Sequence, residues 1–244
     1  MRYNIGSWLF NIWLILWTAG MGLLFAPWAL VALRGAKVCG RLWARGVLFM
    51  LHLLCGITWE VRGREHIVDG PAIYASRHQS AWDTVALLYL LDCPAFVLKR
   101  ELLWLPIYGW HLKQLQMIAI NRSKGASAIK HILQQVKDRL AAGRNVVIFP
   151  EGTRRPPEEP GDYQPGIAAM YRTADAPVVP VALNSGHCWG RNALVKTPGH
   201  IVIEFLPPME RGLDKQAFLQ QLKTRIEGVK PTTSTRSGGL ERSA

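Results

Sequence analysis

Acidic residues are scarce in this sequence, and charged residues of any kind are few. The chain has 244 residues, of which 19% are charged, and its 29 Lys+Arg outnumber its 17 Asp+Glu, which gives a formal net charge of +12. Hydrophobic residues make up 49% of the chain, so the composition excludes a disordered, collagen-like or disulfide-stapled protein. The length allows a sizeable core in one large or two small domains. The positive charge is compatible with binding to nucleic acid, to an anionic membrane surface or to an acidic substrate.

The sequence also has few cysteines and no C-x-x-C pair. The intervals between the four cysteines are long, which excludes zinc knuckles and C-x-x-C redox motifs. We therefore predict no metal site. We interpret the four as buried or membrane-facing thiols in a reducing compartment: Cys39, Cys55, Cys93 and Cys188.

No charged residue occurs from Tyr3 to Leu33. The stretch Ile5–Leu33 is long enough to cross a bilayer, which needs about 20 apolar residues. The alternative is a cleaved signal peptide, but its apolar stretch is usually only about 7–15 residues long and follows a basic region, whereas Arg2 is the only basic residue here. We predict a retained membrane-anchoring region, in which Pro27 kinks or breaks the helix. A nucleic-acid reader would more often carry Lys and Arg along a solvated face, so we expect no nucleic-acid partner. The segment contains tryptophans of the kind found at membrane interfaces: Trp8, Trp13, Trp17 and Trp28.

A basic stripe follows the apolar segment. On a helix its four cations fall within about 80° of arc, and the opposite face is apolar. This pattern favours an interfacial helix against anionic headgroups; the alternative is a solvated helix whose apolar face packs on the protein's own core. Because one cation precedes the apolar segment and four follow it, the positive-inside rule places the rest of the chain in the cytoplasm. The cations are Arg34, Lys37, Arg41 and Arg45, and the opposite face carries Ala36, Cys39, Trp43, Val47 and Met50.

The chain from residue 59 onward alternates short apolar runs with helical patterns. This alternation predicts an α/β fold with a mixed sheet flanked by helices, preceded by the helical membrane-anchoring region. We predict three parts: membrane-associated helices over residues 1–58, a catalytic domain over 59–228, and a disordered tail over 229–244. The predicted helices are Ala81–Leu91, Ser127–Ala142 and Asp214–Ile226. The predicted strands are Thr58–Arg62, Ala72–Ser76, Ala95–Leu98, Met117–Ile120, Asn145–Phe149, Val178–Leu183 and Ile201–Phe205.

One predicted strand leads into a turn that contains His78 and then into a helix with Asp83 in its first turn. Ser80 is a good N-cap, so Asp83 is suited to a capping box, and His78 is then an ordinary loop histidine. In the functional interpretation, the imidazole folds back onto the carboxylate. Asp83 would then fix the tautomer and leave the other ring nitrogen as a general base.

Polar residues follow other predicted strands at places where an α/β sheet binds ligands. Glu151, Gly152, Thr153 and Arg154 come after one strand, where Gly152 allows close backbone approach and Arg154 offers a phosphate fork. The alternative is that Gly152 only makes the turn and the arginine is solvated. Two further cations, Lys99 and Arg122, stand at the ends of strands, and prolines such as Pro180 predict an edge or site-lining strand.

Together these segments resemble the glycerolipid acyltransferases. His78-x4-Asp83, Ile120/Arg122, Phe149-Pro150-Glu151-Gly152-Thr153-Arg154 and Val179-Pro180-Val181 occur in the order and approximate spacing of that family's four blocks. The resemblance implies a bacterial inner-membrane enzyme whose catalytic domain faces the cytoplasm. It implies transfer of an acyl group from acyl-carrier protein or acyl-CoA to the sn-2 hydroxyl of lysophosphatidic acid, giving phosphatidic acid, with no cofactor.

The resemblance also implies roles for individual residues. His78 is the general base and Asp83 its partner; Arg122 and Arg154 bind the phosphate, with Lys99 as a further candidate. Glu151, Gly152 and Thr153 line the glycerol-phosphate pocket, and Pro180 belongs to the fourth block.

Three other functions remain open at this point. One is a membrane-bound hydrolase that uses His78 and Asp83 with a serine such as Ser80, although no G-x-S-x-G elbow is present. Another is a non-catalytic adaptor whose basic face binds anionic lipid. The third is a related acyltransferase that acts on glycerol-3-phosphate, a lysophospholipid or an ornithine lipid.

Overall fold

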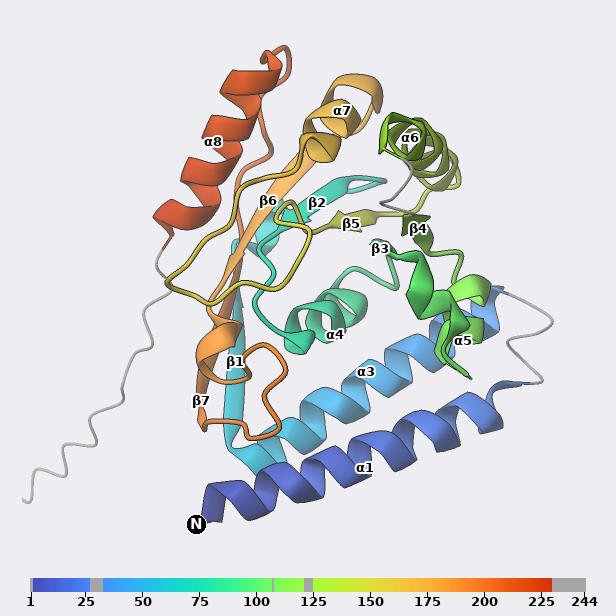
Figure 1. Cartoon of the computed structure of the whole chain (residues 1–244), viewed down its shortest axis with the longest axis vertical. Coiled ribbons are helices and arrows are strands. Elements are labelled where there is room, and N and C mark those ends of the chain that lie inside the picture. The colour runs from blue at the N-terminus through green and yellow to red at the C-terminus, as the bar shows by residue number, and fades with distance from the viewer. Residues whose placement is uncertain (1, 27–32, 107, 121–124, 230–244) are drawn as a thin grey trace, which may run out of the picture.

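The computed structural model of the chain describes residues 2–26, 33–106, 108–120 and 125–229. Its centre is a seven-stranded sheet with the order β1-β7-β6-β2-β5-β3-β4 (Figure 1). All neighbouring strands run parallel except β6 and β7, which are antiparallel. The strands are β1 Ile57–Arg62, β2 Ile73–Ser76, β3 Ala95–Lys99, β4 Ile118–Ile120, β5 Val146–Ile148, β6 Val178–Leu183 and β7 Gly199–Phe205.

The mixed α/β fold is confirmed, and each of the seven predicted strands is present within two residues of its predicted bounds. The runs of Val and Ile form strands because they are buried between two layers of helices. Neighbouring side chains of β5 show this, since Val147 belongs to one core and Val146 and Ile148 to the other.

Helices cover both faces of the sheet (Figure 1). One layer contains α4 (Ala81–Leu90) and α5 (Tyr108–Gln114), and the other contains α6 (Gly125–Ala141), α7 (Pro165–Thr173) and α8 (Lys215–Gly228). The predicted helices correspond to α4, α6 and α8. The sequence did not predict α5, α7 or the 3-10 helices η1 (Arg64–His66), η2 (Arg100–Trp104) and η4 (Ser185–His187), which are too short to show a clear period.

Two long helices, α1 (Arg2–Leu24) and α3 (Leu33–Cys55), form an antiparallel hairpin (Figure 1). Trp17 Nε1 donates to the Trp43 carbonyl at 3.2 Å, and Trp43 Nε1 donates to Thr18 Oγ1 at 3.0 Å. The helices approach closely at Gly6, where a Cβ would overlap the Leu54 carbonyl. The predicted apolar segment Ile5–Leu33 is helical as far as Leu24, and a second apolar helix begins at Leu33. Pro27 lies outside the described residues.

The orientation of α3 corrects the prediction that the face opposite its cations lies against lipid. Arg34, Arg41 and Arg45 are exposed, but Ala36 and Val47 on the opposite face are buried in the protein's own core. The apolar face that was expected to touch lipid therefore packs on protein. The apolar side chains that α3 does expose lie between its arginines and α1: Val38, Leu42, Phe49 and Leu53.

The strand β6 is an interior strand, which corrects the expectation that its prolines mark an edge. Pairing with β7 begins at Val181, one residue after Pro180, so the missing N–H falls at the end of that ladder. The Pro180 carbonyl still accepts from the Leu206 N–H at 3.0 Å. The division into three parts stays a prediction, and the predicted tail lies outside the described residues beyond position 229.

Candidate active site

The turn after β2 holds His78 and Asp83 together. Ser80 is the N-cap of α4, its hydroxyl accepts from the Trp82 N–H at 3.1 Å, and Asp83 completes a capping box. Asp83 is also 3.0 Å from His78, measured between Oδ2 and Nδ1. One carboxylate therefore caps the helix and also faces the histidine, and the role of His78 as a general base stays a prediction. Ser80 is fully buried and occupied as a cap, so it is not placed to serve as the nucleophile of the hydrolase alternative.

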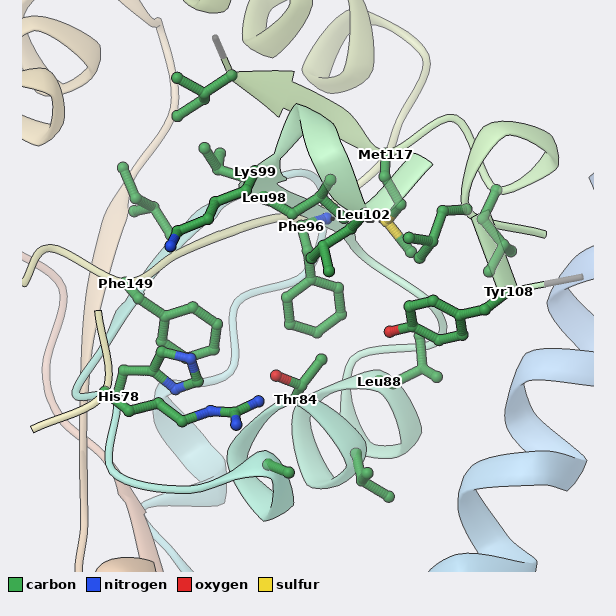
Figure 2. A pocket seen from close by; sticks show the side chains of 18 of the residues that line it. His78, Thr84, Leu88, Phe96, Leu98, Lys99, Leu102, Tyr108, Met117 and Phe149 are labelled. Carbon is green, nitrogen blue, oxygen red and sulfur yellow. Dashed lines mark hydrogen bonds between the residues drawn. The ribbon is translucent and has the colours of Figure 1, made fainter. Parts of the chain in front are cut away.

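His78 is held on two sides. Its ring stacks on Phe149 with 3.8 Å between ring centroids, and Nδ1 faces the buried Asp83. When Nδ1 carries a proton for the carboxylate, Nε2 is the nitrogen left to act as a base. The side chain lies against a cavity (Figure 2).

Glu151 lies behind the histidine rather than in the cavity lining where the sequence analysis placed it. Its side chain is buried, Oε2 accepts from the His78 N–H at 2.9 Å, and Oε1 accepts from the Gly161 N–H at 3.3 Å. Burial raises the pKa of this carboxyl group, while the two backbone hydrogen bonds and the nearby Arg77 oppose the rise. The arrangement makes Glu151 a residue that positions the His78 backbone.

The turn after β5 brings further predicted residues to the cavity. Gly152 has φ +70°, a backbone conformation that favours glycine, and it lines the cavity with Thr153 and Arg154. Lys99 reaches the cavity from the end of β3 (Figure 2). Arg122 lies outside the described residues, and Pro180 does not line the cavity.

The cavity has a volume of about 800 Å³ and is apolar over most of its length. His78, Phe149 and Lys99 lie toward one end, while Leu88, Tyr108 and Met117 lie toward the other (Figure 2). Burial raises the pKa of the Tyr108 phenol, and the positive charge of Arg154 opposes that rise. Beyond these residues the lining reaches the hairpin, with Leu14, Thr18 and Met21 from α1 and Ala36, Cys39, Gly40, Trp43 and Val47 from α3. The site therefore combines a histidine–carboxylate pair, cations and a long apolar channel.

Among the described residues, no group of three or more His, Cys, Asp or Glu side chains is arranged to hold a metal ion. The model of the Acyltransferase family matches residues 58–184, which run from β1 to the end of β6. The chain belongs to the Acyltransferase family.

Relatives of this acyltransferase agree with that assignment. The chain is 37% identical over 185 residues to the 1-acyl-sn-glycerol-3-phosphate acyltransferase of Pseudomonas aeruginosa, covering 76% of this chain and 72% of the relative. It is 28% identical over 198 residues to the human 1-acyl-sn-glycerol-3-phosphate acyltransferase alpha, covering 79% and 69%. The fold is similar to the crystal structure of the 1-acyl-sn-glycerophosphate acyltransferase PlsC from Thermotoga maritima, with TM-score 0.78, 18% identity and coverage of 93% and 94%.

The acyltransferase site contains a residue that sequence reasoning missed. Ser185, the first residue of η4, is fully buried, and its hydroxyl donates a short hydrogen bond to Asp83 Oδ1. The other oxygen of Asp83 accepts from the N–H groups of Gln79 at 2.7 Å and Ser80 at 2.8 Å. The available signal was topological, because Ser185 follows β6, which runs parallel to β2, so both strands end at the same edge of the sheet.

Proposed function

We propose that this acyltransferase moves a fatty acyl group from acyl-carrier protein or acyl-CoA to the sn-2 hydroxyl of 1-acyl-sn-glycerol-3-phosphate, giving phosphatidic acid. The observation that carries the proposal is the His78–Asp83 pair beside an apolar channel with Lys99 and Arg154 in its lining. The names of the relatives support the same substrates.

The chemistry follows from the geometry of the pair. His78 Nε2 takes the proton of the sn-2 hydroxyl while that oxygen attacks the thioester carbonyl carbon. The imidazolium that forms is stabilised by Asp83, which does not itself take the proton. The tetrahedral intermediate then expels the thiolate, which receives the proton from His78, so the histidine ends as it began. A thioester is already activated, and the step needs no covalent enzyme intermediate.

The two ends of the cavity suit different parts of the substrates. Arg154 and Lys99 are suited to the phosphate, with Arg122 as a third candidate from outside the described residues, and Gly152 and Thr153 are suited to the glycerol. The apolar channel toward the hairpin suits an acyl chain, because it excludes water along its length.

We also propose that the hairpin holds the enzyme on the inner membrane, with the catalytic domain in the cytoplasm. Both helices are long and apolar enough to cross a bilayer, and only 22% and 33% of their most apolar windows are buried. Because α3 packs its other face on α4 and the core, we place the hairpin along one leaflet, where exposed arginines meet anionic headgroups.

Replacing Arg34, Arg41 and Arg45 with Gln should weaken binding to anionic liposomes at low salt. Unchanged sedimentation with the liposomes would contradict a role for these charges.

An acceptor panel tests the function. Purified enzyme receives a labelled acyl thioester with lysophosphatidic acid, monoacylglycerol, glycerol-3-phosphate, a lysophospholipid or a lyso-ornithine lipid. We expect lysophosphatidic acid to be acylated best. Equal use of monoacylglycerol would contradict phosphate recognition, and release of free fatty acid without an acceptor would indicate a hydrolase.

A further inference from the structure

Exposed large apolar side chains are confined to a few segments of the described chain. Twelve of the sixteen belong to α1 and α3, and the other four form two adjacent pairs, Trp104–Leu105 and Leu194–Val195. Leu194 and Val195 lie in the loop 188–198 between η4 and β7 and are 59% and 44% exposed. Single exposed apolar residues are ordinary, but an exposed pair beside a larger apolar surface marks an interaction site.

The loop 188–198 is fixed to α1 by hydrogen bonds. Asn11 Nδ2 donates to the Leu194 carbonyl at 2.8 Å, and the Lys196 N–H donates to Ser7 Oγ at 2.9 Å. The Lys196 ammonium group donates to the Leu194 carbonyl at 3.1 Å and to the Asn11 side-chain oxygen. These bonds hold the loop and the first half of α1 as one unit.

The buried end of Lys196 strengthens this attachment. The residue is 2% exposed, and its Nζ lies 4.9 Å from the ring centroid of Trp189 and 5.2 Å from that of Phe10. A desolvated ammonium over two aromatic rings is a favourable cation–π arrangement. Because Phe10 is on α1 and Trp189 is in the loop, the lysine joins the two segments from inside.

The attachment point lies at the border of the exposed stripe of α1. Residues three or four positions apart are neighbours on a helix surface, so Asn11 lies beside Trp8 and Ile15, which are 53% and 68% exposed. The apolar pair of the loop thereby continues the stripe. We propose that Leu194 and Val195 enter the lipid layer as a third membrane contact, beside α1 and α3. This inference rests on the proposed membrane contact of the hairpin.

The same loop reaches the active site from its other side. Trp189, Arg191 and Asn192 line the cavity, and Arg191 Nη1 donates to the Arg154 carbonyl at 3.5 Å. A loop with its tip in lipid and its base in the cavity lining gives a lysolipid headgroup a short route from the bilayer to His78. Arg191 offers that anionic headgroup a cation on the way.

Site-specific quenching tests the contact in the full chain. Leu194→Cys is labelled with an environment-sensitive fluorophore and bound to vesicles of anionic phospholipid with brominated acyl chains, which quench at short range. Trp8→Cys reports on α1. Arg211→Cys is the aqueous control, because it lies near the opposite end of β6 from the loop 188–198. Arg211 is two residues after Met209, whose N–H donates to the carbonyl of Val178, the first residue of β6. The loop follows the last residue of that strand, Leu183, after η4. The four native cysteines are buried, and the unsubstituted chain measures their background labelling.

We expect quenching at positions 8 and 194 and none at 211. Quenching at 8 but not at 194 overturns the loop contact and leaves the hairpin contact standing. The absence of quenching at both positions overturns the hairpin contact and the inference that rests on it.

Activity gives a second readout. The double variant Leu194→Asn/Val195→Asn should lose about 10-fold in kcat/KM for long-chain lysophosphatidic acid in vesicles, because two apolar side chains no longer enter lipid. It should retain activity toward a water-soluble short-chain acceptor, which also shows that the variant is folded. An equal loss for both acceptors would contradict a membrane role.

Discussion

The two ends of the cavity are held by different forces. Around His78, directional hydrogen bonds set the geometry, since Asp83 accepts from Gln79, Ser80 and Ser185 while it faces the imidazole. Around the hairpin end, packed apolar side chains of α1, α3 and α4 set the shape. Small polar changes at the His78 end should therefore alter rate, whereas changes of volume at the hairpin end should alter chain selection.

The largest expected effect comes from His78→Ala. Loss of a general base costs typically about 10²- to 10⁴-fold in kcat, while binding of lysophosphatidic acid should change little. Asp83→Asn should be comparably damaging, because it removes the charge that stabilises the imidazolium. Steady-state kinetics and a separate binding assay check this prediction. A His78→Ala enzyme that kept more than about a tenth of wild-type kcat would remove His78 from the mechanism.

Arg154→Ala should mainly weaken acceptor binding. Loss of a hydrogen bond to a charged group costs about 1.5–3 kcal/mol, so KM for lysophosphatidic acid should rise roughly 10- to 150-fold, and KM for the acyl donor much less. Arg122→Ala is predicted to behave alike. Arg155→Ala is the matched control, because its side chain is exposed. If both KM values drift together and the melting temperature falls, the arginine is structural.

Ser185→Ala should lower kcat about 10-fold, because Asp83 loses a charge-assisted hydrogen bond. KM for both substrates should change little, because Ser185 does not line the cavity. Ser76→Ala is the control, as its buried hydroxyl donates only to the Arg77 carbonyl, at 3.0 Å. A lower melting temperature with an unchanged kcat would assign Ser185 to stability alone.

The smallest expected effect tests the apolar end. Leu88 lies in α4 and lines the cavity (Figure 2), so Leu88→Trp should shorten the channel. We expect the preference for long over short acyl donors to fall about 10-fold or less, measured as a ratio of kcat/KM values. Leu87→Trp, at a buried neighbour outside the cavity lining, should lower stability without changing that ratio. Equal ratios for both variants would place the acyl chain elsewhere.

Local rules predicted the parts of the molecule that local interactions determine. The seven strands follow from short Val- and Ile-rich runs, and the turn from His78 to Asp83 follows from capping chemistry over a few residues. The sequence also predicted that Gly152, Thr153 and Arg154 would lie at a strand end facing a ligand site, and all three line the cavity. Their roles toward substrate stay predictions.

Long-range packing determined what the sequence did not reveal. The apolar face of α3 has the same periodicity whether it meets lipid or protein, so its burial on the core could not be read from the pattern. Glu151 was expected to face the ligand, but its side chain points into the interior, where it accepts a hydrogen bond from the backbone N–H of His78, 73 residues earlier. Ser185 contacts Asp83 although 102 residues of chain separate them, and no spacing pattern in a sequence predicts such a contact.

Asp83 both caps α4 and contacts His78, and this links heat sensitivity to catalysis. The carboxylate that caps α4 is the same one that aligns His78, so opening of the first turn of α4 releases the histidine while the sheet is still intact. On gradual heating, activity should therefore be lost no later than the opening of this turn. A substitution that weakens the start of α4 should therefore cost activity and stability together, even where the sheet is untouched.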